Sequence, residues 1–216
     1  MRHNKYNRRS IEVISVTDQA TDILPLDDVK AFLRIDGTDD DALLTMLIGS
    51  AVESAEKYLR RAIRRQTIEL TMDGFPFSDD DALARMGSGT FQVPPSYITG
   101  GYDEFDLPYP PVASVTSITT YSPSNAASVF AASNYILDGA RITLNQGRTW
   151  PTDLRERAAV KTRYVAGYGP VAVPGSVKLG MMQHIVAMYE CRSGCDMPDA
   201  ARGLMNAYRI LDGLTW

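Results

Sequence analysis

The chain has 216 residues, 44% of them hydrophobic and 22% charged, which excludes a disordered, collagen-like or coiled-coil protein. Twenty-two Lys and Arg residues against 26 Asp and Glu give a net charge of −4. This balance argues against a dedicated nucleic-acid-binding protein, since such proteins present a net basic surface to phosphates. No apolar run reaches the roughly 18 residues of a membrane span, and residues 1–10 lack the apolar part of a secretory signal, so we expect a protein made in the cytoplasm, with no membrane contact.

The first third of the chain predicts a short strand followed by two helices. Residues 11–16 are β-prone, and residues 17–22 have the polar composition of a turn. Apolar residues at three- and four-residue spacing predict a short amphipathic helix from Pro25, which Gly37 closes. Thr38 is the expected N-cap of a long helix that continues to Ile63, and basic residues near its end complement the exposed carbonyls there.

The middle of the chain changes from helical to strand periodicity. At Gln66 the hydrophobic period drops to two, and further β-prone runs follow at 91–93, 102–107, 112–121, 135–144 and 159–166. The run 135–144 predicts a hairpin that turns near Asp138 and Gly139, whereas residues 122–133 are small and polar and predict an exposed loop. After Pro174 helical spacing returns, with Gly194 as a stop and a last amphipathic segment from Leu204 to Leu211.

These patterns predict an α+β fold, in which a helical body is interrupted by a β-rich insertion. The body would have two N-terminal helices and one or two C-terminal helices. We expect an N-terminal arm with a short strand at 1–23, the first part of the body at 24–66, the insertion at 67–173 and the second part of the body at 174–216.

A search for catalytic and ligand-binding motifs predicts no enzyme, cofactor or metal site. The chain has only two histidines, no Gly-x-Ser-x-Gly elbow and no complete phosphate- or dinucleotide-binding glycine motif. His184, Cys191 and Cys195 have helical spacing but are one ligand short of a closed zinc site. We therefore expect both cysteines to pack as free side chains near a helix end rather than to hold a metal or form a disulfide framework.

Several segments, taken in order, resemble one known family. They are Leu24-Pro-Leu-Asp-Asp-Val-Lys-Ala-Phe-Leu-Arg-Ile35, Asp39-Asp-Asp-Ala-Leu-Leu44, Ala51-Val-Glu-Ser-Ala-Glu-Lys-Tyr-Leu59, Arg65-Gln-Thr67, Leu107-Pro-Tyr-Pro-Pro-Val-Ala-Ser-Val-Thr-Ser-Ile118, Tyr135-Ile-Leu-Asp138, Trp150-Pro151, Tyr164-Val-Ala-Gly-Tyr-Gly169, Val173-Pro174 and Tyr208-Arg209. The first four resemble the N-terminal half of the head-tail connector (adaptor) proteins of long-tailed double-stranded DNA bacteriophages and gene transfer agents, and the others resemble the longer, β-inserted branch of that family.

The resemblance implies a structural virion protein in the neck between capsid and tail. Such proteins are not enzymes; they form a homo-oligomeric ring, expected here to be a dodecamer, on the portal protein of the filled capsid. A stopper or tail terminator protein binds the other side, and genomic DNA passes through the ring with weak contact only. The C-terminal segment would reach the portal, through Leu204, Tyr208, Arg209, Leu211 and Trp216.

Two charged segments are candidates for further contacts. A ring of identical subunits needs two different complementary surfaces on each subunit, and the basic residues Lys57, Arg60, Arg61 and Arg64 could meet an acidic stretch of the next copy. Asp79, Asp80 and Asp81 have no evident structural role, and we expect them at the channel or an interface rim, unless they form a solvated loop.

Two alternative functions remain open. The first is a DNA-packaging factor that binds DNA directly, although nothing in the chain resembles a helix-turn-helix motif. The second is a tail-associated binding module built on the β-rich region, where exposed tyrosines could bind sugars. The candidates are Tyr97, Tyr102, Tyr109 and Tyr121.

Overall fold

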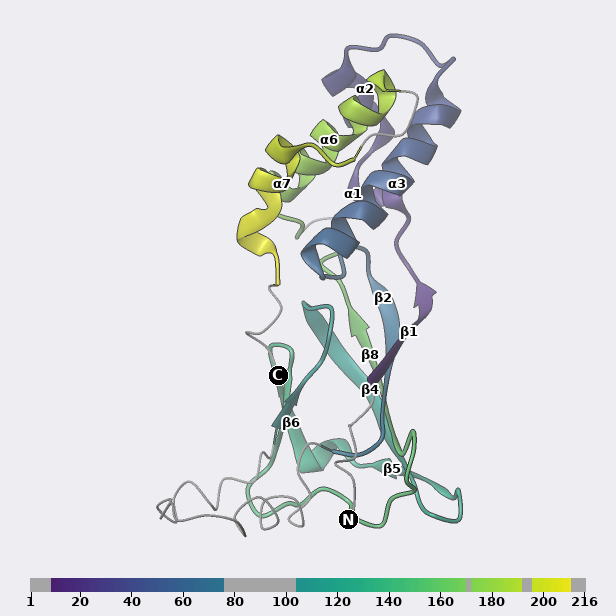
Figure 1. Cartoon of the computed structure of the whole chain (residues 1–216), viewed down its shortest axis with the longest axis vertical. Helices are drawn as coiled ribbons and strands as arrows, with labels where there is room; N and C mark the ends of the chain where they lie inside the picture. Colours follow the sequence, from purple (N-terminus) through teal and green to yellow (C-terminus); the bar gives the residue numbers. More distant parts are fainter. Residues whose placement is uncertain (1–8, 76–103, 170–171, 192–195, 211–216) are drawn as a thin grey trace.

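The computed structural model describes residues 9–75, 104–169, 172–191 and 196–210 of the chain. The molecule is elongated, with helices gathered at one end of its long axis and β-strands at the other (Figure 1). The predicted α+β class is therefore confirmed.

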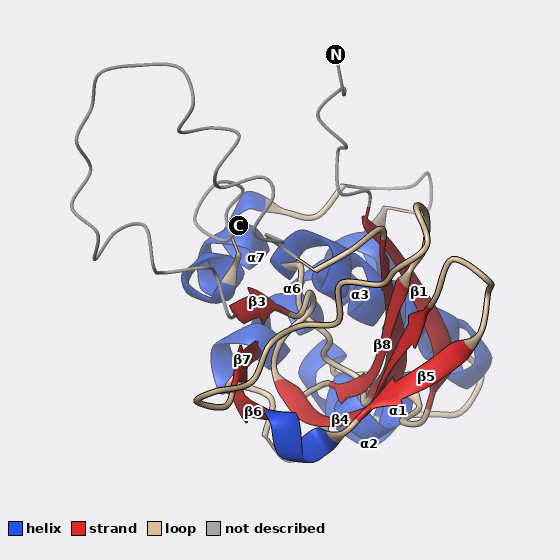
Figure 2. Ribbon diagram, turned by 90° about the horizontal axis from the view of Figure 1, so that it is seen from below, coloured by secondary structure: helices blue, strands red, loops and turns tan. Residues whose placement is uncertain are grey.

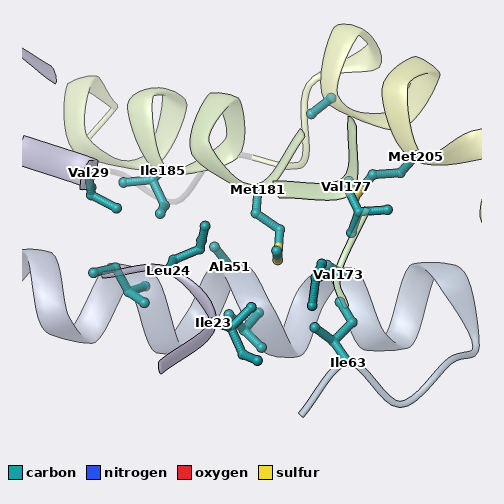
Figure 3. Close-up of a cluster of buried hydrophobic side chains, with 14 of the residues drawn as sticks. Ile23, Leu24, Val29, Ala51, Ile63, Val173, Val177, Met181, Ile185 and Met205 are labelled. Atoms are coloured by element: carbon teal, nitrogen blue, oxygen red, sulfur yellow. The ribbon is translucent and has the colours of Figure 1, made fainter. Parts of the chain in front are cut away.

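The helical end is built from two distant parts of the chain. The N-terminal part supplies α1 (Ala20–Ile23), α2 (Leu26–Leu33) and α3 (Asp41–Leu59), and the C-terminal part supplies α6 (Gly175–Glu190), α7 (Asp199–Met205) and the 3-10 turn η2 (Asn206–Tyr208). Figure 3 shows the apolar side chains of both parts meeting between α3 and α6. Ile48, Val52, Met181 and Ile185 are fully buried in this cluster, so neither part could bury its apolar face alone.

The strands form two antiparallel sheets (Figure 2). The larger sheet has the order β1 (Arg9–Val16), β2 (Gln66–Met72), β8 (Val160–Ala166), β4 (Val112–Tyr121) and β5 (Ala127–Phe130). The smaller sheet has the order β3 (Glu104–Asp106), β7 (Arg141–Leu144) and β6 (Tyr135–Asp138). Strand β1 precedes all the helices in the chain but pairs with β2, so the N-terminal strand is part of the larger sheet.

A second apolar cluster lies between the two sheets. Alternate residues of the larger sheet, such as Ile68, Leu70 and Tyr164, pack with Phe105 and Ile142 of the smaller one. An aromatic group closes this cluster, where the rings of Phe75 and Trp150 stack with centroids 4.3 Å apart. On the opposite face, the central strands β2 and β8 carry mostly polar side chains, among them Glu69, Lys161 and Arg163.

Several predicted boundaries are wrong near the helices. Helix α3 ends at Leu59 rather than Ile63, because Arg60 adopts a left-handed conformation with φ 55°. Its N-cap residue is Asp40 rather than Thr38. The Thr38 carbonyl instead accepts a hydrogen bond from the Asp41 amide, in the turn before the helix. The short helix α1 lies where a turn was expected, and Ile23 at its end is buried in the helical core.

Two further predictions need correction. The expected loop 122–133 contains β5, which is exposed but pairs with β4 through four residues. Cys191, the C-cap residue of α6, is disulfide-bonded and not a free thiol. Cys195, the expected helix stop Gly194 and the run 91–93 lie outside the described residues.

Candidate functional site

The described part of the chain contains no constellation of metal-ligating side chains. Among its residues, no group of three or more His, Cys, Asp or Glu side chains could hold a metal ion. None of the helices in the described ranges is both long and apolar enough to cross a membrane.

Residues 60–65, here called the junction loop, connect the helical end to the larger sheet. The Glu56 carboxylate organises this loop, since it accepts hydrogen bonds from the amides of Ile63 and Arg64 at 3.1 and 3.0 Å and binds the Arg64 guanidinium at 2.8 Å. Glu56 and Arg64 are both largely buried, which makes this pair more than a surface contact.

The junction loop is also fixed to the strands. The amide of Thr17, which follows β1, donates to the Arg65 carbonyl at 2.8 Å, and the Arg65 amide donates to the Asp18 carboxylate at 2.9 Å. After β8, Gly167 has φ 125°, and a Cβ atom there would lie 2.2 Å from the Arg64 carbonyl oxygen. The close approach of these two backbones requires glycine at position 167.

The C-terminal segment 206–210 lies against the end of α3. The Arg61 guanidinium donates to the Tyr208 carbonyl, and the Ile210 amide donates to the Leu59 carbonyl at 3.1 Å. The Arg209 guanidinium stacks 4.8 Å from the centre of the Tyr58 ring. Residues separated by about 150 positions in the chain thus form one surface.

This surface unites two sets of residues that the sequence suggested separately. Tyr208 and Arg209, expected at the portal, lie beside the basic set expected between subunits, and Leu204 is half-buried on α7. Arg61 and Arg64 make contacts within the chain, whereas Lys57 is exposed. The remaining expected site residues, Leu211, Trp216, Asp79, Asp80 and Asp81, lie outside the described residues.

Sequence reasoning missed Glu56 and Tyr58, which anchor the loop and the C-terminal segment. Both lie on the last turns of a helix with an ordinary amphipathic pattern, so local periodicity did not separate them from surface positions. The closely spaced arginines after α3 could have pointed to Glu56 and Tyr58, because several neighbouring guanidinium groups need acceptors close by.

The polar face of the larger sheet carries a charged cluster. Glu69 of β2 is nearly buried and accepts hydrogen bonds from Lys161 at 2.7 Å and Arg163 at 2.8 Å, both on the neighbouring strand β8. The hydrogen bond from Lys161 lowers the pKa of Glu69, with Arg163 adding to the effect, and Glu69 in turn raises the pKa of Lys161. The nearly buried Glu69 carboxylate is thus paired with two cations, and the cluster contributes to stability.

Exposed aliphatic side chains concentrate on strand β1. All eight residues of this edge strand are exposed, and Ile11, Val13, Ile14 and Val16 each leave more than 40% of their surface in solvent. At the other edge of the same sheet, Val129 of β5 is 67% exposed. Both edges of the larger sheet therefore present apolar side chains to solvent.

The same fold occurs in solved structures of gene transfer agent (GTA) particles. Three solved structures have the same fold over 94% of this chain and 98% of theirs. The first is a neck of an empty GTA particle computed with C6 symmetry, with 19% identity and a TM-score of 0.68. The others are a virion of a native GTA particle, with 19% identity and a TM-score of 0.66, and a neck of a native GTA particle computed with C12 symmetry, with 20% identity and a TM-score of 0.65. The likeness extends over both the helical end and the sheets.

Part of the chain also matches a family of known proteins by sequence. Residues 23–96 match the family of Phage gp6-like head-tail connector proteins, which confirms the predicted resemblance. The matched range begins in α1 and includes α2, α3 and β2. A search of the curated proteins found no significant match.

Proposed function

We propose that the chain is a structural subunit of a virion neck, where copies form a ring that connects the capsid to the tail and lets genomic DNA pass. The observation that carries the proposal is the family match to residues 23–96, which supply the first half of the helical body. The common fold with proteins of GTA necks supports it over the rest of the chain. In this role the protein binds its neighbours and catalyses no reaction.

The proposed ring is a dodecamer of identical subunits. The neck structures with the same fold were computed with C6 and C12 symmetry, which supports a ring of repeated copies. Identical subunits in a closed ring make head-to-tail contacts, so each copy needs two different complementary surfaces. The net charge of −4 suits a channel that lets DNA slide, since every neutralised phosphate would add affinity.

The proposed portal contact is the surface formed by segment 206–210 and the end of α3. It combines the exposed Arg209 guanidinium with the Tyr58 ring beneath it, two residue types enriched in protein interfaces, and the exposed Lys57 adds a second positive charge. A stopper or tail terminator protein would bind on the opposite side of the ring. Acidic side chains on the portal would complement the positive charges of Arg209 and Lys57 on this surface.

Particles produced without this chain test the proposed function. We expect capsids filled with DNA but without tails, together with free tails, and restored tailed particles when the chain is supplied in trans. A DNA-packaging factor would instead leave capsids empty, and a tail-associated binding module would leave tailed particles that fail to bind their target. Either of these results would overturn the connector function.

The portal contact has its own test. Mixing the purified chain with portal rings and measuring mass should give a complex that Arg209→Ala weakens at least tenfold, because the substitution removes the charge over Tyr58. Arg202→Ala is the matched control, since Arg202 is a partly exposed arginine on α7 whose partner is the exposed Asp199. Equal binding by the two variants would refute the assignment of this surface.

A further inference from the structure

We propose that neighbouring copies join through their larger sheets, with strand β1 of one copy pairing along β5 of the next. This inference rests on the proposed ring and names its subunit contact. Both strands are edges of one sheet in the described part of the chain, where β1 pairs only with β2 and β5 only with β4. Each edge presents backbone N–H and C=O groups that can pair with another strand.

Strand β1 has the properties of an edge that is covered in the assembled state. Its sequence, Arg-Ser-Ile-Glu-Val-Ile-Ser-Val, contains no proline or lysine, has aliphatic residues on both faces and is exposed along all eight residues. Soluble proteins usually protect such edges with prolines, inward-pointing charges or covering elements, because an exposed apolar edge pairs with other chains. One β-bulge, between Val13 and Ser15, interrupts the regular pairing.

The start of β1, Arg9–Ile11, lies at the same level of the sheet as Ser128–Phe130 of β5. The strand registers connect Ser10, through Thr71, Lys161 and Thr119, to Val129 in one continuous row. A copy displaced sideways along the sheet therefore brings its β1 beside the β5 of its neighbour without sliding along the strands. The contact would cover exposed apolar side chains at both edges, including Ile11 and Val129.

The strand directions fix the geometry of this contact. All four neighbouring pairs in the five-stranded sheet are antiparallel, so its first and last strands run in the same direction. A head-to-tail repeat of the sheet therefore makes the junction a parallel strand pair. Pairing of β1 with β1 would instead be antiparallel and two-fold symmetric, and it would close after two copies. Of these two pairings, only the β1–β5 contact continues into a ring.

Crosslinking in assembled particles tests the contact. Ser10→Cys and Val129→Cys place thiols on the same face and in the same row, at two exposed positions where substitution leaves the core intact. After treatment of purified particles with a short bis-maleimide, we expect the double variant to form covalent trimers and larger ladders of this chain. The parent chain and each single variant should remain monomeric.

The matched control combines Ser10→Cys with Ile136→Cys. Ile136 is 57% exposed, but it lies on β6 in the smaller sheet. An equal ladder from this pair would overturn the inference. So would crosslinked dimers from Ser10→Cys alone, or a band that joins this chain to a different neck protein. The inference would also be overturned if particles that contain the double variant gave no ladder. Absence of the chain from purified particles would overturn the proposed function as well, and immunoblotting of the particles distinguishes this result from a failed strand contact.

Discussion

Substitution of Gly167 by alanine should strongly destabilise the contact between the helical end and the larger sheet. The residue has φ 125°, a backbone conformation that costs a residue with a Cβ of the order of 1–3 kcal/mol. The added Cβ would lie 2.2 Å from the Arg64 carbonyl oxygen and 2.6 Å from its carbonyl carbon, so one backbone must move. Overpacking of this kind costs about 1–3 kcal/mol, which gives a combined loss of about 4 kcal/mol.

Urea denaturation of the purified chain measures this loss. Since single domains have unfolding free energies of about 5–15 kcal/mol, a loss of about 4 kcal/mol would shift the midpoint clearly without a change in slope. Gly49→Ala is the matched control, because Gly49 lies inside α3 and a Cβ there would meet no atom within 4 Å. This control should gain about 0.5–1 kcal/mol. A Gly167→Ala variant as stable as the parent would refute the close backbone approach.

Two hydrogen-bonding side chains in the larger sheet give further predictions. Glu69→Gln should cost about 1 kcal/mol at neutral pH, a modest value because Lys161 and Arg163 are partly exposed. The pKa of Glu69 is lowered in the folded state, so its contribution is complete above the ordinary glutamate range and is lost as the pH falls through the folded pKa. Denaturation at several pH values should show the two proteins converge in acid, and a constant difference would contradict the ion pairs. Tyr164→Phe should cost about 1–2 kcal/mol, because the buried hydroxyl donates to the Pro108 carbonyl at 2.7 Å, and an unchanged denaturation midpoint would contradict that hydrogen bond.

The strands and helices that sequence patterns predicted best are those with strong local signals. Strand β4 has the predicted bounds 112–121, and the hairpin of β6 and β7 turns at Asp138 and Gly139, where φ of the glycine is 61°. Strand β5 was missed because Ala127–Phe130 has neither strict alternation nor a high β-propensity at its start. Its pairing with the preceding strand β4 decides its conformation, and this pairing leaves no mark on a four-residue window.

The end of α3 illustrates a different failure. Apolar spacing continues through Ala62 and Ile63, and both side chains are buried, so the hydrophobic pattern was correct although the backbone is not helical there. Arg60 takes the left-handed conformation that glycine usually provides at a helix end, and the Glu56 carboxylate then accepts the amides of the turn. Burial is compatible with more than one backbone path, and here the hydrogen bonds that the Glu56 carboxylate accepts from the loop select the non-helical path.

The candidate assembly surface depended on the same kind of long-range contact. Residue types alone suggested that Lys57, Arg60, Arg61 and Arg64 contact another subunit, a prediction that stays untested. In the folded chain Arg61 binds the Tyr208 carbonyl across 147 positions and Arg64 binds Glu56, so these two guanidinium groups hold the subunit together. Because both guanidinium groups already bind acceptors within the chain, they have fewer donors left for another subunit than exposed groups have. For this reason the proposed portal contact depends on Arg209 and Lys57, and the proposed ring contact depends on uncharged strand edges.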